Sequence, residues 1–159
     1  MTPPSMPADA MLNPVVMDGF ALDTDLPQSF QALIATAITT LTSDPIYENH
    51  TAGHTWKFTY GTVQVFVHLT GESPSDILTV WASVLPLPVK KQMELLEALL
   101  MKNWSETLEA RFCLWNDQVV LNHTRSLDGL NVSEMTRAIT VVATLADEYD
   151  EVLAAEFNS

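Results

Sequence analysis

Apolar residues recur along this chain at two spacings, and the change from one spacing to the other separates helices from strands. Over residues 26–41 they recur every three or four positions, which predicts a first helix. Asp25 followed three residues later by Gln28 resembles a capped helix start, and Pro45 explains the end, because proline disfavours helical geometry in the residue before it. The apolar face of this helix is Phe30, Leu33, Ile34, Ala37, Ile38 and Leu41.

Strict alternation of apolar and polar residues follows. Residues 56–60 and 63–69 alternate on either side of Tyr60-Gly61-Thr62, which predicts a β-hairpin. Residues 77–85 are apolar at successive positions, as in a strand that is covered on both faces or central in a sheet. Residues 47–51 show a weaker strand pattern.

A second helix and a second hairpin come next. Pro88 suits the first turn of a helix that runs to about Asn103, with a predicted buried stripe of Val89, Met93, Leu96, Leu99 and Leu100. Residues 108–115 and 119–123 alternate around Asn116-Asp117, which is typical of a two-residue hairpin turn.

The last predicted element is a long amphipathic helix. Asn131 with Glu134 resembles a capping box, and the helix is expected to run to about residue 156. Its predicted apolar stripe is Met135, Ile139, Val142, Leu145, Tyr149 and Val152. The order of elements is helix, three strands, helix, two strands, helix.

The chain is expected to hold one domain, over residues 25–159, preceded by a flexible proline-rich tail over residues 1–24. The tail contains one apolar patch, and docking of this patch on the same molecule is favoured over docking on a neighbouring copy. The patch consists of Val15, Val16, Met17 and Phe20.

Charge narrows the kinds of partner. Twenty acidic residues against seven basic ones give a net charge of −13, and the one basic cluster is Lys90-Lys91. Phosphate backbones and anionic lipids attract clustered lysine and arginine, so neither nucleic acid nor a membrane is an expected partner. Without a secretory signal or an apolar span, the expected location is the cytoplasm. The acidity either keeps the protein soluble or favours a basic partner.

No catalytic constellation and no cofactor site are predicted. His50, His54, His68 and His123 are not spaced to converge on a metal ion. The single cysteine, Cys113, lies in an apolar strand pattern and is expected to be a buried core residue.

The candidate binding residues lie on the second face of the sheet and on the last helix. If Val63, Val65 and Phe112 face the helices, alternation places large aromatic side chains on the opposite side, where they mark an interaction surface. The alternative is that the tail or a loop covers them. The acidic cluster on the last helix is read as a solvated face or as a contact for a basic segment. The candidate residues are Phe66, Trp81, Trp115, Asp147, Glu148, Asp150 and Glu151.

Four segments together resemble the YbjN-like family, which shares the fold of the class I type III secretion chaperones. The resemblance covers roughly residues 26–157. It implies an α+β domain with helices packed mainly on one face of an antiparallel sheet, a frequent homodimer, and binding of other proteins without catalysis. Members are labelled sensory-transduction regulators, and similar small proteins in photosynthetic bacteria serve as assembly chaperones, for example for carboxysomes. The segments are Trp56-Lys-Phe-Thr-Tyr-Gly61, Leu99-Leu100-Met-Lys-Asn103, Phe112-Cys-Leu-Trp-Asn-Asp-Gln-Val-Val120 and Leu145-Ala-Asp-Glu-Tyr-Asp150.

Three functional hypotheses follow. The first is a protein-binding domain that acts as a small chaperone, assembly factor or regulator. The second is a structural adaptor that is fixed within a larger complex. The third, from a different class, is a small-molecule sensor or hydrolase with a site around Cys113, His68 and His123.

Overall fold

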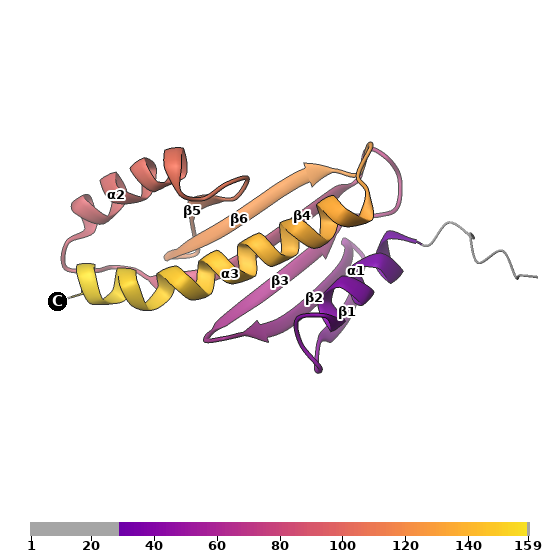
Figure 1. The fold of residues 1–159 in the computed structure, drawn as a ribbon, viewed down its shortest axis with the longest axis horizontal. Helices are drawn as coiled ribbons and strands as arrows, with labels where there is room; N and C mark the ends of the chain where they lie inside the picture. The colour runs from indigo at the N-terminus through magenta and orange to yellow at the C-terminus, as the bar shows by residue number, and fades with distance from the viewer. Residues whose placement is uncertain (1–28, 159) are drawn as a thin grey trace, which may run out of the picture.

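Six strands form one antiparallel sheet in the computed structural model, which describes residues 29–158 (Figure 1). The spatial order is β1-β2-β3-β4-β6-β5, so β1 and β5 are the two edges. Only the β4–β6 contact joins strands that are not consecutive in the chain, and α2 and β5 lie between them in sequence. The strands are β1 (Ile46–His50), β2 (Gly53–Tyr60), β3 (Val63–Leu69), β4 (Ile77–Pro86), β5 (Arg111–Trp115) and β6 (Gln118–Ser126).

The helices are α1 (Phe30–Thr39), α2 (Gln92–Ser105) and α3 (Val132–Phe157). Figure 1 shows α3 running diagonally across one face of the sheet, with α1 beside one of its ends and α2 beside the other. Accordingly, α3 contacts β2, β3, β4 and β6, whereas the main contacts of α2 are with α3 and β5. The predicted α+β class, with helices mainly on one face of an antiparallel sheet, is confirmed.

The weak strand pattern before the first hairpin corresponds to a real strand, β1, so four strands and not three precede α2. It pairs with β2 from Ile46↔Lys57 to His50↔Gly53. All five of its residues are exposed, because the helices pack on the other strands and β1 contacts mainly β2. A strand without a buried face shows no alternation of apolar and polar residues, which explains why the sequence of β1 gives only a weak strand pattern.

Both predicted hairpin turns are present. Tyr60 pairs with Val63 across Gly61-Thr62, and Gly61 has a φ of 53°. A Cβ atom at Gly61 would lie 1.9 Å from Asp147 Oδ1, so the turn needs glycine for its backbone and for its contact with α3. In the second hairpin Asn116 and Asp117 both have positive φ, at 48° and 56°, as a two-residue turn of this hand requires.

The core lies between α3 and the sheet. Asn131 caps α3 by accepting from the Glu134 amide, and the Glu134 carboxylate accepts from the Asn131 amide, so the predicted capping box is confirmed. The predicted stripe is correct over the first half of α3. Toward its end, Leu153 is buried while Val152 is 52% exposed. An α-helix has 3.6 residues per turn, whereas the predicted stripe from Met135 to Val152 takes three steps of three residues and two of four, so it drifts off the buried face toward the end of α3. The buried side chains are Met135, Ala138, Ile139, Val142, Ala143, Ala146, Leu153 and Phe157.

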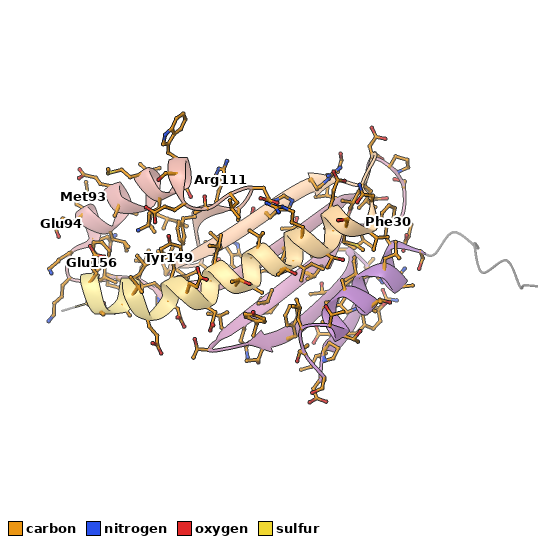
Figure 2. The ribbon with its side chains drawn as sticks, viewed as in Figure 1. Phe30, Met93, Glu94, Arg111, Tyr149 and Glu156 are labelled. Carbon is orange, nitrogen blue, oxygen red and sulfur yellow. The ribbon has the colours of Figure 1, made fainter. Side chains whose placement is uncertain are left out.

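The predicted buried stripe of α2 is partly wrong. Leu95 and Leu99 are buried, but Met93 is 70% exposed and Leu100 is 72% exposed. The helix carries apolar residues on two faces, and the domain covers only one of them. Figure 2 shows Met93 and Glu94 at the start of α2, beside Glu156 at the end of α3.

The first helix is shorter than predicted among the described residues. Ser29 caps α1 by accepting from the Ala32 amide, and Glu72 accepts from the amides of Phe30 and Gln31. The predicted cap at Asp25 and Gln28 and the predicted tail over residues 1–24 lie outside the described residues.

We expect Ile139→Ala to destabilise the protein strongly, because its fully buried side chain lies in the α3–sheet core. Such truncations cost about 2–5 kcal/mol. Denaturant unfolding monitored by circular dichroism measures the change. Val152→Ala on the same helix is the matched control and should change the free energy of unfolding by less than about 0.5 kcal/mol. Equal effects of the two changes would contradict the assigned orientation of α3.

Candidate protein-binding site

The face of the sheet turned away from α3 carries the candidate site, and strand register decides which side chains it presents. Phe66 on β3 lies opposite Trp81 on β4, and Trp81 lies opposite Asn122 on β6. Because neighbouring residues on a strand point to opposite faces, Val65 and Val67 are fully buried while Phe66 is half-buried between them. We call this side, presented by alternate residues of β3, β4, β6 and β5, the open face.

Three aromatic side chains form a continuous cluster on the open face. The Phe66 and Trp81 rings are stacked, with centroids 5.1 Å apart and planes 9° apart. Trp81 meets Trp115 edge-to-face at 6.2 Å. Trp115 is 55% exposed, so the cluster ends in a side chain that is free to contact another molecule. We call Phe66, Trp81 and Trp115 the aromatic cluster.

Two hollows flank the aromatic cluster. One, of about 380 Å³, is lined by Thr79, Trp81, Cys113, Leu114, Trp115, Val120 and Asn122. The other, of about 490 Å³, is lined by Thr62, Val63, Gln64, Phe66, Trp81, Ser83, Val84, Trp115, Gln118, Val120 and Asp150. Both are shallow features of a surface, which suits side chains of a partner better than an enclosed small ligand.

One edge of this surface is basic and the other acidic. Lys57 on β2 places its Nζ 5.5 Å from the centre of the Phe66 ring, where a cation interacts favourably with the ring face. At the other side Asp150 reaches the larger hollow from α3. An acid from the predicted acidic cluster therefore borders the aromatic cluster.

The structure divides the four predicted acidic residues into two pairs. Asp147 accepts from the Thr62 amide at 2.7 Å, and Asp150 accepts from the Thr62 hydroxyl at 2.6 Å. Both therefore hold the β2–β3 turn against α3. Glu148 and Glu151 are exposed. Asp147 and Asp150 are thus half-buried and have structural partners, and the role of the four residues as a solvated face or as a contact for a basic segment stays a prediction.

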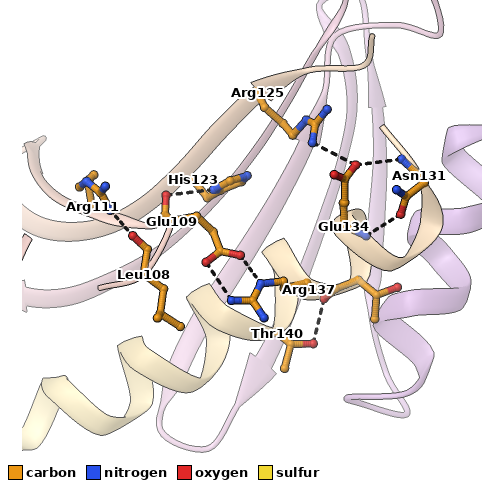
Figure 3. Close-up of polar contacts among 10 residues, drawn as sticks. Leu108, Glu109, Arg111, His123, Arg125, Asn131, Glu134, Arg137 and Thr140 are labelled. Atoms are coloured by element: carbon orange, nitrogen blue, oxygen red, sulfur yellow. Dashed lines mark hydrogen bonds and ion pairs between the residues drawn. The ribbon is translucent and has the colours of Figure 1, made fainter. Parts of the chain in front are cut away.

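Polar contacts on the helix side fix the loop between α2 and β5. Arg137 on α3 donates from Nε to Glu109 Oε1 at 2.5 Å, and this hydrogen bond holds the pKa of Glu109 below its usual value (Figure 3). His123 Nδ1 lies 3.2 Å from the Glu109 carbonyl oxygen. Arg125 pairs with Glu134, the capping residue of α3, at 3.2 Å. His123 and Arg125 thus face α3, on the side opposite the aromatic cluster.

The residues of the sensor or hydrolase hypothesis do not come together. Cys113 belongs to the open face, whereas His123 faces the helices. His68 forms a hydrogen bond with Thr55. Its strand, β3, is separated from β5 by β4 and β6, so the two strands lie ~14 Å apart at the usual strand spacing. Among residues 29–158, no three histidine, cysteine, aspartate or glutamate side chains are grouped as metal ligands would be.

The prediction that Cys113 is a core residue is wrong, because its side chain lies on the open face, which the helices do not cover, and is exposed. Neighbouring side chains still remove enough water to raise the pKa of the thiol above its ordinary value. A raised pKa reduces the thiolate fraction at neutral pH, so the geometry does not make Cys113 a strong nucleophile.

The fold and the open face define the class of the protein: an open antiparallel sheet with helices on one side and an apolar, aromatic surface on the other. Two solved structures share this fold. The ExsC–ExsE complex matches with a TM-score of 0.58 and 13% identity, over 76% of this chain and 90% of that one. The HopA1–SchA chaperone–effector complex matches with a TM-score of 0.54 and 14% identity, over 77% and 93%.

The chain belongs to the YbjN family. The family model, described as "Putative bacterial sensory transduction regulator", matches residues 31–155. The resemblance seen in the sequence is thereby confirmed, as is the type III secretion chaperone-like fold. No curated protein matches the chain by sequence.

Sequence reasoning missed a second apolar surface, on α2. Its most exposed members are Met93, Leu100, Met101 and Trp104, which are 70%, 72%, 73% and 93% exposed. The sequence did contain a signal for this surface. Helix α2 has more apolar residues than one buried stripe can hold, and Trp104 lies outside the stripe that the sequence predicted. The helices of the described region do not include one with the length and apolar content needed to cross a bilayer.

We expect Cys113 to react slowly with iodoacetamide at pH 7 although it is exposed, because its raised pKa leaves little thiolate. The reaction rate should keep rising with pH, up to pH values above the pKa of an ordinary cysteine. Mass spectrometry of the alkylated protein over a pH series measures this. The denatured protein is the control and should react faster at pH 7, whereas a faster reaction in the native state would contradict the assignment.

Proposed function

We propose that this chain is a non-enzymatic protein-binding domain that acts as a small chaperone, assembly factor or regulator of a partner protein. The observation that carries the proposal is the aromatic cluster on the open face. Large aromatic side chains are costly to leave in water and dominate the binding energy of many interfaces. Here they continue into two shallow hollows of several hundred Å³.

The partner segment that fits this surface is apolar, with a basic flank on the side of Asp150. Phe66, Trp81 and Trp115 supply apolar contact, and Asp150 supplies a carboxylate at the rim. The net charge of −13 steers a basic segment toward the protein, while Glu148 and Glu151 are exposed for contact with it. The aromatic cluster supplies the affinity for the partner, and the negative charge of the protein raises the rate of association.

Further parts of the proposal are a homodimer and a cytoplasmic location. The fold is shared with proteins solved in complexes, one of them a chaperone–effector complex. Assembly of a carboxysome-type structure is one setting in which such a domain would work. A structural adaptor of a larger complex is the alternative, and it differs in that its complex is permanent and not transient.

Affinity isolation of the tagged protein from its own cell extract, with the bound proteins identified by mass spectrometry, tests the proposal. We expect a client that is retained at low salt and reduced at high salt, because screening weakens the charge contribution. Phe66→Ala and Trp115→Ala should each lower its recovery at least about tenfold, the effect of losing ~1.4 kcal/mol or more at a hot spot. Their thermal transitions should stay within a few degrees of the wild type.

The matched control is Tyr47→Ala, which removes an aromatic side chain that is 47% exposed on the edge strand β1. It should leave client recovery unchanged. Bound client should also protect Cys113, which lines one of the two hollows, from alkylation. Equal loss in all three variants, or full retention in Phe66→Ala and Trp115→Ala, would argue against the open face as the binding site.

A further inference from the structure

Within residues 29–158 no helix or loop covers the aromatic cluster, although this part of the open face is apolar. Trp115 is 55% exposed, and Phe66 and Trp81 are half-buried. The hollow of about 380 Å³ lies beside Trp81 and Trp115, with Cys113 in its wall. Exposed apolar surface with a polar rim usually marks a contact with another segment or molecule. Charge and chain length indicate which contact this is.

The strands contribute more positive than negative charge to the open face. Lys57 and Arg111 each lie between two buried residues of the chain, so alternation places both cations on this face. Neither forms an ion pair with a carboxylate among residues 29–158. The one acid of the six strands, Glu48, lies 3.0 Å from His50. An apolar segment that carries carboxylates is therefore complementary to the strands of this face in both respects.

The sequence contains such a segment ahead of α1, in the part of the chain that lies outside the described residues. Residues 15–22 hold five apolar side chains larger than alanine, and residues 1–28 hold four aspartates but neither lysine nor arginine. We call residues 15–22 the tail segment. Its composition matches an aromatic surface with cations beside it. The apolar members are Val15, Val16, Met17, Phe20 and Leu22, and the nearest aspartates are Asp18 and Asp23.

The chain between the tail segment and α1 is long enough to reach the open face. The Phe30 amide donates to Glu72 at 2.9 Å, so the chain enters α1 beside the β3–β4 loop. Phe66 lies three residues before Leu69, the last residue of β3, or ~10 Å along the strand. The ten residues from Phe20 to Phe30 span ~33 Å when extended. Phe20 can therefore pass the end of the sheet and reach Phe66.

We propose that the tail segment docks on the open face of its own molecule and excludes other partners until one displaces it. Phe20 lies against the aromatic cluster, and Val16 lies in the hollow of about 380 Å³. Asp23 lies near Lys57, whose Nζ is 5.5 Å from the centre of the Phe66 ring. A client with a basic flank at Asp150 needs the same rings, so client and tail segment compete. The inference rests on the open face as the client site of the proposed function and adds its regulation.

Attachment to the domain makes a weak contact sufficient. A short tether gives an effective concentration in the mM range. At about 1 mM, a segment that binds in isolation with a dissociation constant of about 0.1 mM occupies its site in about nine of ten molecules. A competing client then binds about tenfold more weakly than it would bind to the free site. Occupancy of this order still permits displacement by the client.

The first test uses Cys113, the single cysteine, as a reporter on the open face. In the full chain, Val15→Cys should form a disulfide with Cys113 within one molecule on mild oxidation, because the docked tail segment holds the two thiols close together. The matched control adds Val16→Ser/Phe20→Ser, which keeps the tether and the charge and removes apolar contact. Its disulfide should form at least about fivefold more slowly. Non-reducing electrophoresis and mass spectrometry of the linked peptides measure the rate.

The second test needs no added thiol. At one fixed pH, iodoacetamide should alkylate Cys113 at least about fivefold faster in Val16→Ser/Phe20→Ser than in the wild type, because the hollow is no longer occupied. The burial that raises the pKa of the thiol comes from the domain and is the same in both proteins. Met11→Ser/Leu12→Ser, which removes two apolar residues outside the tail segment, is the matched control and should react as the wild type does. Circular dichroism checks that each variant is folded.

Three outcomes would overturn the inference. The first is an equal rate of alkylation in the wild type and in Val16→Ser/Phe20→Ser, or an equal rate of disulfide formation in the two Val15→Cys proteins. The second is a disulfide that links two molecules, which would assign the tail segment to a neighbouring copy. The third is protection of Cys113 that depends on protein concentration and not on the tail segment, which would place another copy on the open face.

Failure of this inference can be told from failure of the proposed function. If both hold, client recovery rises about tenfold in Val16→Ser/Phe20→Ser, by loss of the competition, and falls in Trp115→Ala. Equal alkylation rates together with loss of the client in Trp115→Ala would refute docking of the tail segment and leave the protein-binding function intact. A Val15→Cys disulfide within one molecule, with no client retained by any variant, would do the reverse.

Discussion

Burial of α3 against the sheet is the interaction on which the rest of the structure depends. Eight of its side chains are buried, and the helix contacts four of the six strands and both other helices. The β2–β3 turn is held to it through Thr62, and the loop before β5 is held through Glu109 and Arg137. The hydrophobic contribution of one helix thus fixes which face of every strand becomes the core.

The same constraint creates the surface available for binding. All three helices lie on or beside one face of the sheet, so the other face has no cover within the described residues. Alternation along β3 and β4 then places Phe66 and Trp81 there, each between two fully buried residues of its own strand. The open face is consequently rigid at Phe66 and Trp81, because both neighbours of each ring along its strand are buried. A rigid aromatic surface loses little conformational entropy when a partner binds.

Local chemistry made much of the fold predictable, and its limits explain the errors. The turns at Gly61-Thr62 and Asn116-Asp117 and the Asn131–Glu134 cap are determined by neighbouring residues, so the sequence alone identifies them. Burial is not local. The side of α2 that carries Leu99 and the side that carries Leu100 are both apolar. Only the positions of β5 and α3 decide which of the two sides is buried. Cys113 and β1 were misjudged for the same reason, since local sequence does not show which face and which strand the helices leave uncovered. The meeting of Phe66, Trp81 and Trp115 could be predicted from alternation, whereas the approach of Asp150 to them could not.

The position of α3 in the order of elements affects synthesis of the protein. All six strands precede α3 in the chain, and translation proceeds at about 5–20 residues per second. The valine-rich strands therefore emerge one to several seconds before the 26 residues that cover them have been made. During that interval the future core face is exposed to other nascent chains and to the cell's folding machinery. Packing of α3 against the sheet is thus a late step in the formation of the domain.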